Sequence, residues 1–278
     1  MSGTESSFGG AGDGARQPAE DANPHLPEDP NFMTSLARGL SVIRAFSDRE
    51  QSLSISDVAR ITGLPRAAAR RCLLTLQRLG YVGTDGRAFH LTPQILSLGY
   101  SYLSSAPLAT TVHPALERVS TLLQESSSAG ILAEDDVVYI ARSATKRIMS
   151  VALNVGSRLP AAVTSMGRVL LAALPAAELD AFVRRVELPR HTERTITDRD
   201  ALRAEIEATR SRGYALVDQE LEVGLRSIAV PLRNASGAVS AAINVSTQAG
   251  RVGIDEMLER YLPVLRDAAE EIRPLLRL

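Results

Sequence analysis

The segment 54–91 restricts the possible fold more than any other part of the chain. Ser54 and Asp57 stand at the spacing of a helix-capping box, and Gly63 ends the helix that they begin. A second helix follows the Gly-Leu-Pro sequence, and a short hairpin then turns at Asp85-Gly86. Two helices joined by a tight turn and followed by a hairpin predict a winged helix-turn-helix, a fold that places one helix in the major groove of DNA.

The second helix of this segment has two different faces. By the 3.6-residue period, its apolar residues share one face, which we expect to be buried: Ala69, Cys72, Leu73, Leu76 and Leu79. The opposite face and the N-terminal end carry arginines, whose planar forks can bind guanine through two hydrogen bonds. We therefore predict DNA contacts from this helix, the hairpin and two preceding positions: Arg38, Ser54, Arg66, Arg70, Arg71 and Arg87.

The sequence leaves the kind of contact open. Each helix arginine can meet a base or a phosphate, and a merely solvated basic face is the simpler alternative. Arg87 at the hairpin suits a phosphate or the minor groove, while Ser54 and Arg38 suit phosphates. Charge supports the DNA-binding interpretation. The whole chain has a net charge of −1, yet residues 34–91 hold nine arginines against four acids, a net +5.

Composition argues against several other classes of protein. With Cys72 as the single cysteine, no intrachain disulfide can form, and the four histidines lack metal-ligand spacing. We expect no metal, no other cofactor and no enzymatic activity. Asp218, Glu220 and Glu222 alternate with apolar residues, so we interpret them as exposed strand or loop acids. No apolar run is long enough to cross a bilayer, and no signal peptide is evident, which favours a cytoplasmic location without a membrane partner.

The chain divides into four predicted regions. Residues 1–31 are rich in Gly, Ser, Ala, Pro and acids and read as a disordered tail. Residues 32–92 form the winged helix-turn-helix domain, and residues 93–106 form a linker helix with an apolar side. Residues 107–278 mix helices with strands, which predicts an α+β fold around a central antiparallel sheet.

The second domain has a predictable order of elements. Helices are expected at 112–126, 165–174, 176–186 and from residue 254, where Pro263 can introduce a kink, and Thr197 is expected to cap another helix that ends at Gly213. Residues 154–164 are expected to form a loop. The predicted strands are 130–133, 137–141, 148–153, 214–217, 226–232 and 239–246.

Alternation in the last two strands suggests a binding surface. In one strand Ser227 alternates with apolar Ile228, and in the next Asn244 and Ser246 share a side that Val245 does not. One sheet face is therefore apolar, and the other carries small and polar groups. A pocket for a small polar molecule and a face turned to solvent both fit this pattern.

The chain resembles the IclR family of bacterial transcriptional regulators. The similarity covers about residues 34–276. The motifs that carry it are SLARGLSVIRAF, DVARITGLPRAAARRCLLTLQRLGYV, LTPQILSLGYSYL, LPAAVTSMGRVLLA and LEVGLRSIAVPLRNASGAVSAAINVS. The first three motifs are most similar to a subgroup that regulates aromatic-acid breakdown through the β-ketoadipate pathway.

The resemblance implies a GAF-like effector domain and a homodimer or homotetramer built partly through the N-terminal domain and linker helix. It also implies effector contacts at matching positions. Met166 stands where smaller residues are common, and Ser227 stands where some members have cysteine, so both leave the ligand open. The implied effector residues are Val151, Ser165, Met166, Asp218, Ser227, Asn244 and Ser246.

A carboxylate ligand needs hydrogen-bond donors. The free N–H groups at the start of the Ser165 helix are one source, and Arg142, Arg147, Arg158 or Arg226 is another. The resemblance implies β-ketoadipate, protocatechuate or 4-hydroxybenzoate as effector, a DNA operator as partner, and activation of an aromatic-acid operon. A repressor of another carboxylate pathway, a protein-contact module and an enzyme with a regulatory domain are the alternatives.

Overall fold

The computed structural model describes residues 30–46, 50–99, 107–145 and 153–276. The chain divides into two compact units, Met1–Tyr102 and Leu103–Leu278. Most of the predicted tail, the end of the predicted linker helix and nearly all of the predicted strand 148–153 lie outside the described residues. The four-region division expected from sequence stays a prediction. No helix in the described ranges combines the length and apolar character that crossing a bilayer requires.

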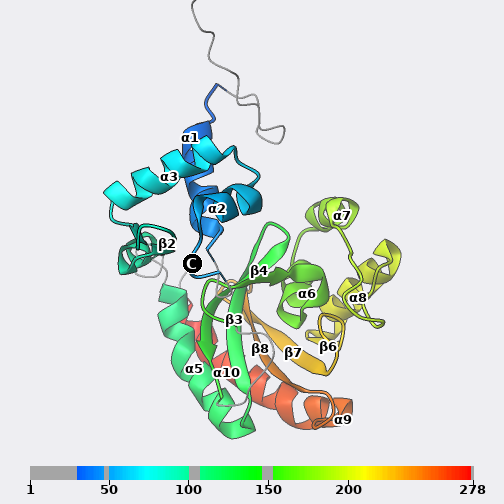
Figure 1. The fold of residues 1–278 in the computed structure, drawn as a ribbon. Coiled ribbons are helices and arrows are strands. Elements are labelled where there is room, and N and C mark those ends of the chain that lie inside the picture. Colours follow the sequence, from blue (N-terminus) through cyan, green and yellow to red (C-terminus); the bar gives the residue numbers. More distant parts are fainter. Residues whose placement is uncertain (1–29, 47–49, 100–106, 146–152, 277–278) are drawn as a thin grey trace, which may run out of the picture. The chain divides into compact units, whose positions relative to one another are not determined.

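The described part of the first unit contains the helices α1, α2 and α3, a small hairpin and a helical segment at 96–99 (Figure 1). Leu53 adds an isolated antiparallel bridge to Phe89, so the hairpin is tied back to the start of the second helix. The elements are α1 (Thr34–Arg44), α2 (Ile55–Thr62), α3 (Arg66–Arg78), β1 (Val82–Thr84), β2 (Phe89–Leu91) and the 3-10 turn η1 (Pro93–Ile95).

Local chemistry sets the boundaries of α2 and α3. The predicted capping box is confirmed, because the Asp57 N–H donates to Ser54 Oγ at 3.2 Å and the Ser54 N–H donates to Asp57 Oδ2 at 3.1 Å. The Ser54 hydroxyl and the Ser54 N–H both donate to the Asp57 carboxylate, and these two bonds hold the pKa of Asp57 below its usual value. Gly63 has a φ of +69°, a conformation in which glycine meets no Cβ penalty. Pro65 occupies the N-cap position of α3, directly before its first helical residue, Arg66.

The buried face of α3 is narrower than predicted. Leu73 and Leu76 are buried as expected, together with Ala68 and Ala69. Cys72 is only half-buried, and Leu79 is 61% exposed. The reason is that Leu79 lies beyond the last helical residue, on the side where α1 and α3 leave an open groove.

The second unit contains a six-stranded antiparallel sheet in the order β5-β4-β3-β8-β7-β6. Its strands are β3 (Ser126–Ala133), β4 (Asp136–Ser143), β5 (Arg158–Pro160), β6 (Ala215–Asp218), β7 (Leu225–Arg233) and β8 (Val239–Gln248). Its longer helices are α5 (Pro107–Leu123), α6 (Ser165–Ala172), α7 (Ala176–Arg185), α8 (Arg199–Arg212) and α10 (Leu262–Ile272), with short turns η2 (Ala161–Val163), α9 (Ile254–Glu256), η3 (Met257–Tyr261) and η4 (Arg273–Leu275).

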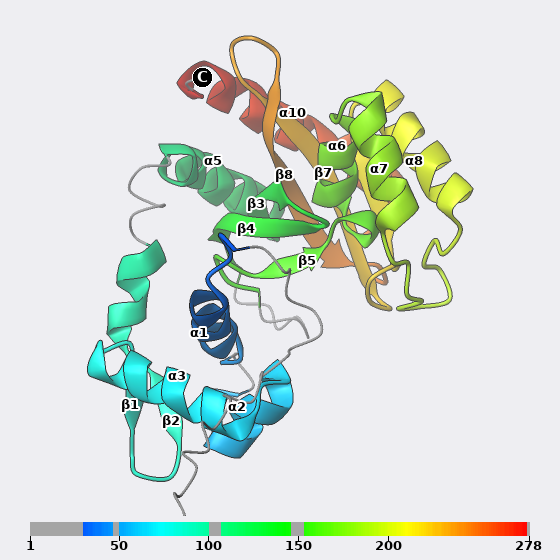
Figure 2. The same ribbon diagram turned by 90° about the horizontal axis from the view of Figure 1, so that it is seen from above.

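Helices cover both faces of this sheet, as Figure 2 shows. The helices α5 and α10 pack on one face, where Ile228, Ile243 and Val245 belong to the same apolar cluster as residues of both helices. The opposite face meets α6, and Ala229 and Ala242 join its cluster. The alternation predicted for β7 and β8 is therefore confirmed, and the small-residue face is a covered surface rather than one open to solvent.

The predicted cap of α8 and the predicted loop 154–164 are wrong, whereas the helix from Ile254 begins as predicted. Asp198 caps α8 by accepting from the Ala201 N–H at 2.8 Å, because its carboxylate reaches a position that the Thr197 side chain does not. The expected loop 154–164 contains β5 and η2, since β5 pairs with the outer edge of β4. Before Pro263 the helix takes a π turn, which fits a residue that cannot donate to the carbonyl four positions earlier.

Candidate functional site

The arginines of α3 are free to meet a nucleic acid. Arg66, Arg70 and Arg71 are exposed on the first two turns of the helix, away from the buried Leu73. Within the described part of the chain, none of their guanidinium groups forms a hydrogen bond or an ion pair. All three side chains can therefore turn toward phosphates or base edges without breaking an existing contact.

The other predicted DNA contacts differ in their surroundings. Arg87 is exposed at the hairpin tip, where Asp85 Oδ1 accepts from the Arg87 N–H at 2.9 Å and so shapes the turn. The Ser54 hydroxyl already donates to Asp57 Oδ2 at 2.6 Å, so a phosphate contact there competes with the capping box. Arg38 is half-buried in the groove between α1 and α3, apart from the exposed face of α3.

The groove between α1 and α3 is markedly apolar for an exposed surface. Leu36 on α1 is 57% exposed, and Leu79 beyond α3 is exposed to a similar degree. Contiguous apolar patches of this kind usually mark an interaction surface. Its apolar lining residues include Met33, Leu36, Leu40, Ile43, Cys72, Leu76, Leu79, Tyr81 and Leu98, and the polar residues Ser35, Arg38, Arg71 and Thr75 also line it.

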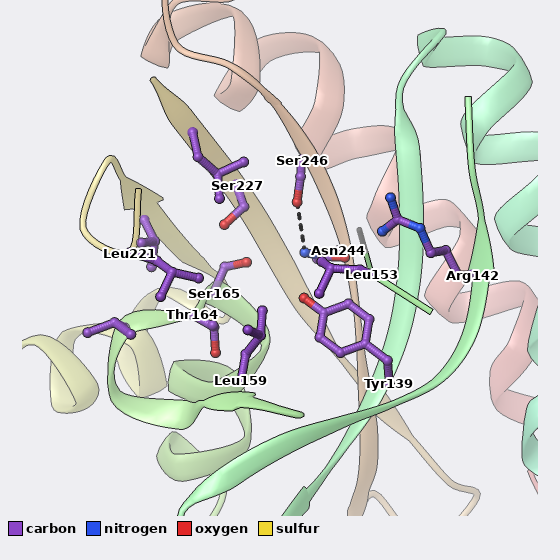
Figure 3. Close-up of a pocket in the computed structure, with 13 residues that line it drawn as sticks. Tyr139, Arg142, Leu153, Leu159, Thr164, Ser165, Leu221, Ser227, Asn244 and Ser246 are labelled. Atoms are coloured by element: carbon purple, nitrogen blue, oxygen red, sulfur yellow. Dashed lines mark hydrogen bonds between the residues drawn. The ribbon is translucent and has the colours of Figure 1, made fainter. Parts of the chain in front are cut away.

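The second unit contains a pocket between the sheet, the start of α6 and the loop that joins β6 to β7 (Figure 3). Its empty volume is about 520 Å³ with the opening to solvent included. Aliphatic side chains form most of its walls, and a few polar groups point into it. The lining residues are Tyr139, Arg142, Leu153, Leu159, Val163, Thr164, Ser165, Val217, Leu221, Leu225, Ser227, Asn244 and Ser246.

A β-bulge brings Tyr139 and Arg142 into this pocket together. In a regular strand, residues three apart point to opposite faces. The register of β4 shifts, so that Arg142 pairs with Ser128 while Tyr139 pairs with Gly130 and Ile140 is the extra residue. Both side chains consequently lie on the pocket face of the sheet (Figure 3).

Arg142 is the pocket's charged group. Its Nη1 donates to Ser128 Oγ at 3.2 Å, and no carboxylate in the described ranges pairs with it. Burial lowers the pKa of the guanidinium, and the interaction with Tyr139 partly offsets this lowering. The group remains a cation at neutral pH. Burial also raises the pKa of Tyr139 to about 12, so its phenol is a neutral donor. A partly buried cation without an acidic partner is suited to an anionic ligand.

The other candidate arginines are occupied or undescribed. Arg158 is half-exposed, and its Nε donates to Asp136 Oδ2 at 2.9 Å. Arg226 is buried, but its Nε donates to Asp218 Oδ1 at 2.7 Å and it also holds backbone carbonyls. Arg147 lies outside the described residues. Among the four candidates, Arg142 is therefore the described one that faces the pocket.

The start of α6 supplies further donors on the other side of the pocket. Thr164 caps the helix by accepting from the Gly167 N–H at 3.2 Å. The Ser165 hydroxyl is buried and has no hydrogen-bond partner in the described structure. A buried polar group without a partner is costly, so this hydroxyl is prepared for a ligand or water. The positive end of the helix dipole adds to its preference for a negative or electron-rich group.

The structure brings together part of the predicted effector set. Ser165, Ser227, Asn244 and Ser246 line one pocket, and Asn244 Nδ2 donates to Ser246 Oγ at 3.2 Å (Figure 3). Val151 lies outside the described residues.

Two predicted effector residues have other surroundings. Met166 is fully buried in the apolar cluster beneath the sheet, beside Gly130. Asp218 is held by ion pairs with Arg226 and Arg194. Burial opposes its ionisation, yet these pairs outweigh burial and lower the pKa of Asp218.

Glu220 corrects one interpretation made from sequence. It was expected to be an exposed acid, but it is 7% exposed and ion-paired with the buried Arg168. The alternation of acidic and apolar residues in this loop does not predict whether Glu220 is buried. Its burial comes from contact with α6, which lies about fifty positions away in the chain. Tyr139, Leu221 and Leu225 also line the pocket but were not predicted, because no local signal in the sequence marks them.

Both units of the chain match models of known protein families. Residues 35–86 match the model of the IclR helix-turn-helix domain, and residues 100–273 match the model of the bacterial transcriptional regulator IclR C-terminal domain. The chain belongs to the IclR family. Members of this family are DNA-binding regulators, not enzymes, and the helix-turn-helix unit is the DNA-binding part of the chain.

Three IclR relatives are particularly informative. The Pca regulon regulatory protein of Pseudomonas putida is 52% identical over 88% of this chain and 84% of its own. The p-hydroxybenzoate hydroxylase transcriptional activator of Acinetobacter baylyi is 37% identical over 91% of this chain and 97% of its own. The crystal structure of an IclR homologue from Microbacterium hydrocarbonoxydans, complexed with 4-hydroxybenzoate, superposes with a TM-score of 0.74 at 25% identity, over 86% of this chain and 98% of that one.

Proposed function

We propose that this IclR regulator controls genes for aromatic-acid catabolism and binds a small carboxylate in the pocket of its second unit. The effector candidates are β-ketoadipate, protocatechuate and 4-hydroxybenzoate. One observation carries the proposal: Arg142 stands in a largely apolar pocket without a carboxylate partner in the described ranges. As a DNA-binding regulator, the protein would act in the cytoplasm.

The pocket suits a ligand with an apolar body and polar ends. Arg142 and Tyr139 enter from β4 at one side, while Thr164 and Ser165 lie across the pocket from them (Figure 3). Leucine side chains stand between these polar groups. A hydroxybenzoate places a carboxylate and a phenol at opposite ends of a ring, and β-ketoadipate places two carboxylates at the ends of a short chain. Both shapes match two separated sets of donors.

The relatives support the same class of effector. One relative is named for the Pca regulon, another for activating the p-hydroxybenzoate hydroxylase gene, and the Microbacterium homologue holds 4-hydroxybenzoate. We therefore propose activation of an aromatic-acid operon. The alternative is that the protein represses the genes of another carboxylate pathway. In that case, a reporter gene placed behind the adjacent promoter would be transcribed more strongly in a strain that lacks this protein.

Replacing Arg142 tests the effector site. We expect Arg142→Gln to weaken binding of the effector by roughly 30-fold or more, because removing the cationic partner of a buried carboxylate costs about 2 kcal/mol or more. Isothermal titration with β-ketoadipate, protocatechuate and 4-hydroxybenzoate measures this directly. Arg158→Gln is the matched control, since Arg158 pairs with Asp136 at the surface and does not line the pocket. Equal affinity of Arg142→Gln and wild type would remove Arg142 from the site.

We also propose that the chain forms a homodimer through the groove between α1 and α3. A winged helix-turn-helix regulator reads two half-sites when two copies are joined, and this groove offers the apolar area for such a contact. We expect a Leu36→Glu/Leu40→Glu variant to sediment as a smaller species than wild type. Both side chains are exposed, so the variant should keep its helical content by circular dichroism.

The matched control for this variant is Leu122→Glu/Leu275→Glu, which places the same charges on exposed leucines of the second unit. This control should leave the sedimentation coefficient unchanged. An unchanged sedimentation coefficient for the Leu36/Leu40 variant would show that the groove does not hold the copies together.

A further inference from the structure

A buried ion pair lies behind one wall of the pocket. Arg168 on α6 is 1% exposed, and its Nη1 and Nη2 donate to the two carboxylate oxygens of Glu220 at 2.7 and 2.5 Å. Its remaining donor, Nε, bonds the Ala162 carbonyl at 3.1 Å. A two-pronged arrangement of this kind fixes direction as well as distance, because the guanidinium and the carboxylate are both planar.

The pair joins the segments that form the pocket wall. Ala162 belongs to η2, whose last residue Val163 lines the pocket together with the following Thr164. Glu220 belongs to the loop between β6 and β7, whose Leu221 is the next residue and lines the pocket. Arg168 therefore connects η2, its own helix and the β6–β7 loop through a single side chain.

The β6–β7 loop is held by bonds of its own and by contacts with neighbouring segments. The Gln219 N–H donates to the Leu225 carbonyl at 2.8 Å, and Gln219 has a φ of +61°, which is unfavourable for a residue with a side chain. Thr192 and Thr195 hold the loop from a second side, through bonds of 2.7 Å to the carbonyls of Gln219 and Glu220. Polar contacts from Arg168, Thr192 and Thr195 therefore anchor the loop to the segments around it.

Stability alone does not explain the Arg168–Glu220 pair. Taking both charges out of water is costly, and replacing a buried pair by apolar residues of similar size is often neutral or stabilising. Removing only one partner is strongly destabilising, because the other charge is left buried alone. This difference allows a positioning role to be separated from a role in holding the fold together.

We propose that Arg168 and Glu220 are positioning residues that hold the β6–β7 loop as a preformed wall of the effector pocket. The inference rests on the proposed function of that pocket. A preformed wall reduces the ordering that binding requires, so the pair increases affinity without touching the ligand. Because the pair holds this loop, loss of the pair should make the loop less ordered while the rest of the pocket stays as it is.

The test compares a variant in which both partners are replaced with a variant in which only Glu220 is replaced. Arg168→Met/Glu220→Leu should melt near the wild-type temperature, whereas Glu220→Leu alone should melt well below it. We expect the double variant to bind the effector roughly tenfold more weakly, which corresponds to about 1.4 kcal/mol. Amide hydrogen exchange of the full chain, without effector, should be faster at residues 219–225 and unchanged in β3 and β8. The probes are β-ketoadipate, protocatechuate and 4-hydroxybenzoate.

The control is Arg203→Met/Asp180→Leu, which removes an ion pair between α7 and α8 that holds no lining residue. It should change neither affinity nor exchange at 219–225. Unchanged exchange at 219–225 in the Arg168/Glu220 double variant overturns the proposal, as does a general loss of protection with a fall in melting temperature. If wild type binds none of the three probes, the proposed effector class fails, and the exchange result alone decides the positioning role.

Discussion

Replacing Arg66, Arg70 and Arg71 together by alanine should lower operator affinity by roughly 100- to 1,000-fold. Each arginine–guanine contact contributes about 1–3 kcal/mol of discrimination, and phosphate contacts add a sequence-independent share. All three side chains are exposed at the start of α3, and their guanidinium groups form no hydrogen bond or ion pair within the described chain. The variant should therefore fold normally, and the loss should appear directly in a gel-shift titration against the protein's own upstream DNA.

The same titration, repeated over a range of salt concentrations, separates the two kinds of contact. Each lost phosphate contact should reduce the slope of the logarithm of the binding constant against the logarithm of the salt concentration by about 0.9. A lost base contact should mainly reduce the preference for the operator sequence. Arg78→Ala is the control, because Arg78 is exposed at the far end of the same helix and should cost much less. Undiminished affinity in the triple variant would show that α3 is not the reading helix.

A methyl group at Gly167 should disrupt the second unit. A Cβ at this position would overlap the backbone of Ala161 and lie 2.6 Å from its carbonyl carbon, so α6 would have to move away from η2. We expect Gly167→Ala to destabilise the unit by about 1–3 kcal/mol, although alanine is otherwise the better helix former. Because Thr164 joins the two segments and Ser165 begins α6, and both line the pocket, effector binding should be lost as well.

Thermal unfolding of the full chain and titration with the three effector candidates measure both effects. Gly250→Ala is the matched control, because no atom lies within 4 Å of a Cβ there and its backbone conformation accepts a side chain. An unchanged melting temperature for Gly167→Ala would contradict the close approach of α6 to η2. Stability lost with affinity retained would show that the start of α6 does not contribute to the pocket.

Local sequence signals predicted much of the first unit. The capping box of Ser54 and Asp57, the turn at Gly63 and the hairpin at Asp85-Gly86 all involve residues within a few positions of one another. Helix periodicity also placed the arginines of α3 on an exposed face. It overestimated the buried face at Leu79, because periodicity does not say where a helix ends or which neighbour covers it.

For the second unit, the sequence by itself determined the strands β7 and β8 and the alternation that points Ser227, Asn244 and Ser246 to one side. The tertiary structure decided what that side faces. The bulge that turns Arg142 into the pocket and the burial of Glu220 against Arg168 both depend on partners in other elements. A side chain's local pattern specifies its direction, but its burial, charge partner and ligand access depend on groups that only folding brings beside it.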